Sequence, residues 1–172
     1  MATRGLTAFL WGRMSAPGQS AFEVGRHVFC HDQNHFTHLR NWRVAEYEGR
    51  IVGALNGYVV PEQTAPAAPT LDVVEPLNAL KAMAAGTWYI SAAAIYPEHQ
   101  GKGFGKSLLV EAERIARTAE KDRLTLLVGS FNGRAHRLYL QVGFKDWDRR
   151  PFVPFPGSDE PGEWILMVKE LA

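Results

Sequence analysis

Residues 100–106 place glycine and lysine where a helix should begin. The run Gln100-Gly101-Lys102-Gly103-Phe104-Gly105-Lys106 follows an apolar stretch over 88–96 and opens a helical pattern over 107–120. Each glycine costs about 1 kcal/mol against alanine inside a helix, and the lysines put positive charge at the end of the helix dipole that favours anions. Both features suit a bound anion, because glycines let backbone N–H groups approach it and lysines neutralise it. We therefore interpret the run as an anion-binding loop, with a phosphate ester as the expected ligand. A flexible turn with solvated lysines is the alternative.

The spacing of the glycines excludes two familiar phosphate loops. The Walker A pattern would require glycine where the chain has Gln100. The dinucleotide pattern G-x-G-x-x-G fails because its last position falls on Lys106 or Leu108. The next apolar strand, 124–128, runs into Gly129 and not into an aspartate that would hold magnesium. A nucleotide-phosphate enzyme is therefore disfavoured, and the pattern that fits is Gln-x-x-Gly-x-Gly.

Two segments carry a resemblance to a known family. The first runs Ala93-Ala94-Ile95-Tyr96-Pro97-Glu98-His99-Gln100-Gly101-Lys102-Gly103-Phe104-Gly105-Lys106 and resembles the coenzyme A motif of the GNAT superfamily of acyl-CoA-dependent N-acyltransferases. The second, Asn132-x-x-Ala135-x-x-Leu138-Tyr139-x-x-x-Gly143-Phe144, resembles the second cofactor motif of that superfamily. The two segments stand in the right order and are separated by one strand-like run. The resemblance is clear over 88–144.

The resemblance implies a fold, a cosubstrate and a reaction. The fold class is mixed α/β (α+β), with a mostly antiparallel central sheet of six to seven strands flanked by helices on both faces. Acetyl-CoA or coenzyme A is the implied cosubstrate, and an acetyl group passes directly to a primary amine of a small molecule, protein or peptide. The implied cofactor-binding residues are Ala93, Ala94, Ile95, Gln100, Gly101, Lys102, Gly103, Phe104, Gly105, Lys106, Asn132 and Tyr139.

Acyl transfer from a thioester to an amine also sets chemical requirements. The amine must lose its proton, the oxyanion needs a backbone N–H, and the departing thiolate benefits from a proton donor. Tyrosine, with a pKa of about 10, stays protonated at neutral pH and can donate. By resemblance, Tyr139 is the catalytic proton donor and Ile95 the oxyanion N–H; alternatively, Tyr139 is a core aromatic and Asn132 only a helix cap. No general base is assigned among the candidates Tyr89, Ser91, Glu98, His99 and the N-terminal histidines.

Length predicts one domain over 1–172. Helical spacing makes 1–43 its helical N-terminal part, and the resemblance places the cofactor motifs over 88–144. Hydrophobic content of 46% and charged content of 22% are ordinary for a globular protein, and the net charge of +1 gives no reason to expect nucleic acid or membrane as a partner. The single cysteine, Cys30, suits a reducing compartment, and we expect a cytoplasmic protein. Because that cysteine is far from the motifs in sequence, we expect direct transfer without a covalent acyl-enzyme.

Periodicity and turn residues predict the elements along the chain. We expect helices over 6–14, 21–30, 77–85, 107–120 and 133–142, and strands over 44–47, 51–60, 88–96, 124–128, 144–147 and 164–168. The strand over 88–96 is expected to be buried on both faces. Its small residues Ala92, Ala93 and Ala94 would let a helix pack closely, and the resemblance implies that they also admit the pantetheine arm. Members of the superfamily usually begin with a strand, whereas here no strand pattern precedes Leu6.

Three further stretches leave alternatives open. His27, His31 and His35 share one helix face if the helix extends that far, but convergence on a metal is not expected and the metal prediction is none. The connection between Pro61 and Gly86 could form one wall of an acceptor pocket. The aromatic, proline-rich segment 151–157 is either part of that pocket or ordinary loop packing. The rival function is a non-catalytic acyl-CoA-binding module of the same fold, and family members often pair, which suggests a homodimer.

Overall fold

A computed structural model describes residues 3–62, 71–158 and 161–171. Six strands form one sheet in the order β1-β2-β3-β4-β6-β5, and only the neighbours β3 and β4 are parallel. The strands are β1 (Trp42–Tyr47), β2 (Arg50–Val59), β3 (Trp88–Ile95), β4 (Arg123–Gly129), β5 (Lys145–Pro151) and β6 (Glu163–Glu170). The described chain therefore confirms a mixed, mostly antiparallel sheet of six strands.

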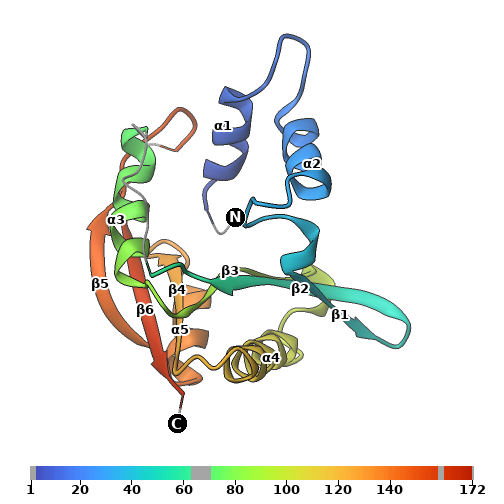
Figure 1. Cartoon of the computed structure of the whole chain (residues 1–172), viewed down its shortest axis with the longest axis vertical. Coiled ribbons are helices and arrows are strands. Elements are labelled where there is room, and N and C mark those ends of the chain that lie inside the picture. The colour runs from blue at the N-terminus through green and yellow to red at the C-terminus, as the bar shows by residue number, and fades with distance from the viewer. Residues whose placement is uncertain (1–2, 63–70, 159–160, 172) are drawn as a thin grey trace.

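Helices cover both faces of this sheet (Figure 1). One face carries α1 (Leu6–Arg13), α2 (Ala21–His31) and α3 (Glu75–Met83), and the other carries α4 (Phe104–Thr118) and α5 (Gly133–Gln141). Short 3-10 turns span Leu39–Asn41, Asp72–Val74 and Pro97–His99. The first described strand is β1, so α1 and α2 precede the sheet, as the lack of a strand pattern before Leu6 predicts.

Local sequence explains where the elements begin and turn. Ser20 and Glu23 form a reciprocal capping box at the start of α2, in which the Ser20 amide donates to the Glu23 carboxylate at 2.8 Å. Between β1 and β2, Glu48 and Gly49 both have positive φ, 51° and 72°. Two such residues make the type I′ turn that suits the twist of a hairpin.

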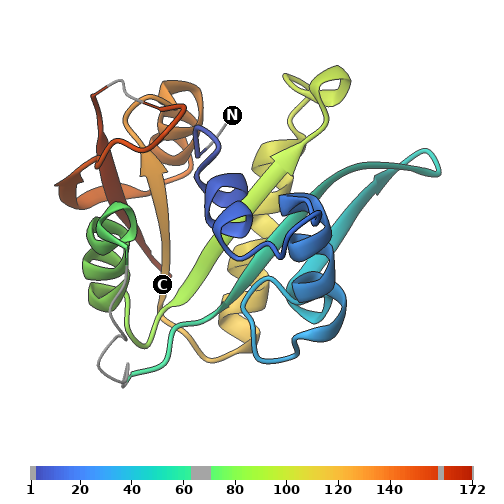
Figure 2. The same cartoon turned by 90° about the horizontal axis from the view of Figure 1, so that it is seen from above.

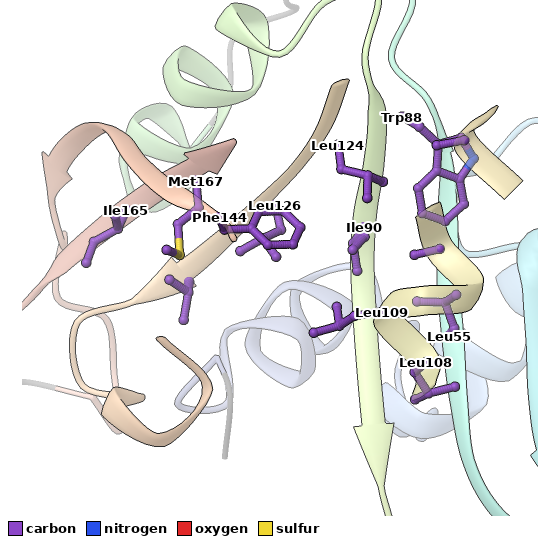
Figure 3. Packing of buried hydrophobic residues seen from close by; sticks show 13 residues of the cluster. Leu55, Trp88, Ile90, Leu108, Leu109, Leu124, Leu126, Phe144, Ile165 and Met167 are labelled. Carbon is purple, nitrogen blue, oxygen red and sulfur yellow. The ribbon is translucent and has the colours of Figure 1, made fainter. Parts of the chain in front are cut away.

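Two apolar clusters, one on each face, hold the helices to the sheet. On the α4 and α5 face, Leu108 and Leu109 pack on Ile90, Leu126 and Phe144 (Figure 3). On the opposite face the buried cluster consists of Leu6, Val60, Leu80, Ala84, Tyr89, Phe152, Phe155, Trp164 and Leu166. Because inward and outward residues alternate along a strand, neighbours such as Tyr89 and Ile90 serve opposite clusters.

The burial predicted for the third strand is correct only for its first three residues. Residues 88–90 are buried, whereas Ala93 and Ala94 are exposed. The reason is the sheet itself: β3 pairs with β4 only at Trp88, Tyr89 and Ile90. Beyond that point no described strand pairs with the β4 side of β3, which the apolar sequence pattern could not reveal.

The two phenylalanines of the segment 151–157 are core residues, whereas its prolines and Gly157 are exposed. Phe152 and Phe155 are 6% and 5% exposed and pack against Trp164 in the buried cluster. They therefore do not line an open acceptor pocket. Much of the connection between Pro61 and Gly86, residues 63–70, lies outside the described residues; its described part includes α3.

Candidate active site

The parallel strands β3 and β4 diverge after three paired residues, and we call this divergence the fork. Its closed end is the pairing from Trp88↔Leu124 to Ile90↔Leu126, and its arms are residues 91–95 and 127–129. Figure 2 shows the two strands pointing apart from this junction. At the closed end the hydroxyls of Thr87 and Thr125 lie 2.6 Å apart, and both side chains are buried. This contact ties the strands together where the fork begins.

The β3 arm of the fork presents free peptide groups. On its other edge β3 pairs with β2, and the Tyr96 amide donates to the Val52 carbonyl at 3.0 Å. Successive N–H groups of a strand point in opposite directions, so those of Ala93 and Ile95 point away from β2 and into the fork. A register shift between Asn56 and Gly57 leaves Ser91 as an extra residue on β3. Such a bulge bends the strand and is common beside functional sites.

The glycine loop lies at the open end of the fork, where β3 leads through Pro97–His99 into α4. Gly101 and Gly103 have φ of 80° and 90°, the left-handed region that suits glycine, while an added Cβ would meet nothing within 4 Å at either position. Glycine is therefore required at these two positions by the backbone conformation and not by a lack of space for a side chain. Gly105 is different, because a Cβ there would approach the Leu138 side chain at 3.2 Å. It lets α4 and α5 pack closely.

The N–H groups at this helix start are available to a ligand. The first backbone bond into α4 is from Ser107 to the Gly103 carbonyl, and no described residue is recorded as accepting from the amides of 101–106. Lys102 and Lys106 are exposed beside them. Free amides, the positive end of the helix dipole and two ammonium groups are the features that favour anion binding.

Gln100 connects this loop to both neighbouring elements. Its amide nitrogen donates to the Ile95 carbonyl at 3.0 Å, and its amide oxygen accepts from Arg134 at 2.8 Å. Arg134 belongs to the first turn of α5, so the second motif segment is held directly against the first. No spacing pattern in the sequence links position 134 to the loop, so the contact of Arg134 with Gln100 is visible only in the folded chain.

Helix α5 brings Asn132 and Tyr139 to the same side of the sheet. The Asn132 side chain accepts from the Ala135 amide at 3.4 Å, which confirms it as a helix cap. Tyr139 packs against the core, with its ring centroid 5.8 Å from that of Phe144. Burial raises the pKa of the Tyr139 phenol, so this group keeps its proton at neutral pH and can act as a donor.

The sequence also matches a known family over most of its length. The match is to the acetyltransferase (GNAT) family and covers residues 8–144. The chain belongs to this family. A search of curated proteins gave no match.

Solved structures show the same fold for this GNAT chain. Naa20 from Chaetomium thermophilum, solved with a bisubstrate analogue, matches with a TM-score of 0.58 at 19% identity and covers 99% of this chain and 84% of its own. The ribosomal-protein-S18-alanine N-acetyltransferase of Escherichia coli gives 0.55 at 18% identity, with 77% and 70% covered. Salmonella typhimurium yncA, solved with its cofactor acetyl-CoA, gives 0.52 at 21% identity over 76% of this chain and 64% of its own. The matched region thus spans less than two thirds of the Salmonella protein.

The candidate general bases lie at both ends of the fork, Tyr89 at the closed end and Glu98 and His99 at the open end. Tyr89 is 7% exposed, and burial raises the pKa of its phenol, which disfavours the phenolate. His99 lies beside Phe104 at the loop, with ring centroids 6.2 Å apart. Glu98 is exposed in the same turn. No geometry among these groups assigns a base.

The N-terminal histidines do not converge. Helix α2 ends at His31, whose ring stacks on His27 at 4.8 Å. His35 lies beyond the helix and stacks on Phe36. Throughout the described ranges, no three His, Cys, Asp or Glu side chains are grouped as a metal site. Likewise, none of the helices described has the length and apolar character to span a membrane.

Proposed function

We propose that this GNAT protein transfers the acetyl group of acetyl-CoA directly to a primary amine. The observation that carries the proposal is the fork with the glycine loop at its open end. A thioester carrier needs a site for its diphosphate and a channel for its extended arm. The free amides of 101–106 suit the diphosphate, and the unpaired edge of β3 suits the pantetheine arm.

The proposed binding residues divide by the part of the carrier they serve. Gly101, Lys102, Gly103, Phe104, Gly105 and Lys106 hold the diphosphate, with Gln100 fixing the loop. The N–H groups of Ala93 and Ile95 bind the arm or the acyl oxygen, and the small side chain of Ala94 leaves room beside them. Asn132 lies at the start of α5, where it contacts the carrier. The free edge of β3 supports these roles for Ala93 and Ile95, because their N–H groups face the fork.

Acetyl-CoA, when bound, supplies an acetyl group already activated as a thioester. The chain orients that group, excludes water with the core around Ile90 and Leu126, and provides a proton at the Tyr139 hydroxyl. The high pKa of the Tyr139 phenol keeps that proton available for a departing thiolate. Direct transfer is supported by the position of Cys30, the chain's single cysteine, in α2 and outside both motif segments.

We also propose a cellular location, a domain organisation and an oligomeric state for this enzyme. One cysteine and a net charge of +1 support a reducing, cytoplasmic location. We treat residues 1–172 as one domain, because both apolar clusters pack on a single sheet. A homodimer remains our expectation for the oligomeric state, and light scattering of the purified protein measures it.

The test is calorimetry with acetyl-CoA, followed by thiol release with a panel of primary amines. Gly103→Ala should weaken acetyl-CoA binding by about tenfold, because the left-handed backbone costs alanine about 1 kcal/mol and the amides tilt from the anion. Gly18→Ala is the matched control, since Gly18 has φ of 82° and similar open space but lies before α2. Absence of acetyl-CoA binding by wild type refutes the proposal. Binding without thiol release from any amine would identify a non-catalytic acyl-CoA-binding module.

A further inference from the structure

Lys81 of α3 extends its ammonium group over three aromatic rings. The Nζ atom lies 4.7 Å from the ring centroid of Phe36, 5.0 Å from that of Tyr58 and 5.6 Å from that of Tyr89. We call these three rings the aromatic cage. They come from the loop after α2, from β2 and from β3, so three distant parts of the chain converge on one lysine.

The Lys81 ammonium has no anionic partner among the described residues. Within those residues the ammonium makes no hydrogen bond or ion pair, and its charge contacts only the faces of the three rings. Burial lowers the pKa of Lys81, and no carboxylate is among the causes of that shift. His35 beside it adds no charge of its own at neutral pH, because burial lowers its pKa below the ordinary value. A partly buried ammonium has three N–H donors, and buried charges are normally paired.

The aromatic cage adjoins the closed end of the fork from the face opposite the glycine loop. Tyr89 makes the connection: its residue pairs with Thr125 at that end, and its phenol lies near enough to the Leu127 backbone on the β4 arm for that backbone to affect the pKa of the phenol. The Tyr89 phenol also lies near enough to Tyr58 and Tyr139 to be affected by their charges. The loop and α5 occupy the other face, so an acceptor amine has the side of α1, α2 and α3 from which to approach.

We propose that Lys81 binds a carboxylate of the acceptor, and that the acceptor is therefore a small primary amine of the amino-acid type. This inference rests on the proposed acetyltransferase function. An external carboxylate would satisfy the donors that the protein leaves free, and the rings would exclude water from the pair. One ammonium without a second charged basic group matches a monoanion better than a phosphate, which carries close to two charges at neutral pH.

The experiment compares carboxylate-bearing amines with neutral ones. The panel consists of the standard amino acids, β-alanine and γ-aminobutyrate, each beside its primary carboxamide, at saturating acetyl-CoA with thiol release as the readout. For at least one pair, the kcat/KM of the wild-type enzyme should be about tenfold or more higher for the amino acid than for its carboxamide. This is the difference expected from losing one charge-assisted hydrogen bond. Calorimetry should show the same preference in binding of that pair to the enzyme–coenzyme A complex.

Three variants separate recognition from other roles. Lys81→Met should abolish the preference through KM while leaving acetyl-CoA affinity unchanged. Lys81→Arg should retain most of it, because arginine keeps the charge and the donors but cannot serve as a general base. Lys145→Met removes an exposed lysine of β5 and is the matched control.

Several outcomes would overturn the inference. They are equal use of amino acids and carboxamides, a preference that survives Lys81→Met, a Lys81→Arg variant as impaired as Lys81→Met, or no turnover of any carboxylate-bearing amine by protein that binds acetyl-CoA. An acetyl group found on Lys81 itself by mass spectrometry would make this lysine an acceptor and also overturn it. Failure to bind acetyl-CoA at all is distinguishable, since it is seen before any amine is added and refutes the proposed function instead.

Discussion

The position of Gln100 requires a side chain that both donates and accepts. Its nitrogen serves the Ile95 carbonyl and its oxygen serves the Arg134 guanidinium. A glutamate would place negative charge against the carbonyl, and a lysine would repel the arginine, so a neutral amide is the residue that fits both partners. Through this single side chain the end of β3, the glycine loop and the start of α5 keep a fixed relation.

At the same scale, Tyr139→Phe tests the proposed proton donor. Removing the hydroxyl should lower kcat by about 10²-fold, because general acid catalysis contributes at least that much. The pKa of the Tyr139 phenol is raised by burial, so the wild-type hydroxyl stays protonated across neutral pH and the loss should be nearly constant there. Thiol release measured at several pH values checks this. Equal turnover by both proteins at all of them would remove Tyr139 from the mechanism.

At the scale of elements, the closed end of the fork depends on two buried threonines. The Thr87 hydroxyl donates to the Ala84 carbonyl at 2.7 Å and lies 2.6 Å from the Thr125 hydroxyl. Thr87→Val should lower the free energy of unfolding by about 1–3 kcal/mol, because it leaves the Thr125 hydroxyl buried without its partner.

Urea unfolding measures that change. Thr125→Val should cost less, about 1 kcal/mol, since Thr87 still donates to Ala84. The double variant should be less destabilised than the sum of the two single variants, because both remove the same contact. Additive losses would show that the hydroxyls do not act as a pair.

A second element-scale link joins α5 to β5. The Asp146 carboxylate accepts from His136 and pairs with Arg149, both at 2.7 Å. Burial alone would raise the pKa of Asp146, but hydrogen bonds from His136 and Arg149 outweigh it, and the net pKa lies below its ordinary value. A carboxylate with a lowered pKa stabilises the fold above its unfolded-state pKa, and that contribution disappears as the pH falls through the folded-state pKa.

Asp146→Asn should therefore cost about 1 kcal/mol of unfolding free energy at neutral pH and progressively less in acid. Urea unfolding of both proteins at successively lower pH measures the difference. Asp122→Asn is the control, because its side chain is 81% exposed and its partner Arg123 is 3.7 Å away. A difference that persists unchanged into strong acid would contradict the assigned role of the carboxylate.

At the scale of the whole molecule, the sequence predicted the helices and strands better than it predicted how the strands pair in the sheet. Amphipathic periods located the helices, and Glu48-Gly49 located the hairpin, because these signals are local. The fork was not visible, since strand divergence depends on pairing between residues far apart, and the apolar run over 88–96 was wrongly expected to be buried throughout. β5 extends to Pro151, beyond the predicted end, because an edge strand tolerates arginines and a terminal proline.

Local signals also explain which residues of the candidate site could be predicted from the sequence. The glycine loop, Asn132 and Tyr139 lie in continuous motifs, so the sequence alone could point to them as candidates. Arg134 and Lys81 act through partners distant along the chain, at Gln100 and at the aromatic cage. Nothing in the sequence indicates that a single lysine in a helical pattern is partly buried. The position of Lys81 among the three aromatic rings is therefore visible only in the folded chain.

The fork also predicts how a ligand should affect the whole sheet. Within the sheet, β1, β2 and β3 pair with β4, β6 and β5 through three residue pairs, which the threonine contact supports. A carrier that pairs with β3 inside the fork and with the loop amides would add bonds across this weakest junction. Because it binds the native state and not the unfolded chain, acetyl-CoA at about 100 times its dissociation constant should add about 2.7 kcal/mol to the free energy of unfolding.

Hydrogen exchange locates that stabilisation. With acetyl-CoA bound, the amides of Ala93, Ile95 and 101–106 should slow most, whereas the Tyr96 amide, already bonded to Val52, should change only through the general gain in stability. The turn at Gly18 serves as an internal reference, because it lies before α2 and away from the fork. Uniform slowing of all amides would mean that the ligand stabilises the protein without using the free edge of β3. Protection at 101–106 alone would restrict the contact to the diphosphate and leave the arm outside the fork.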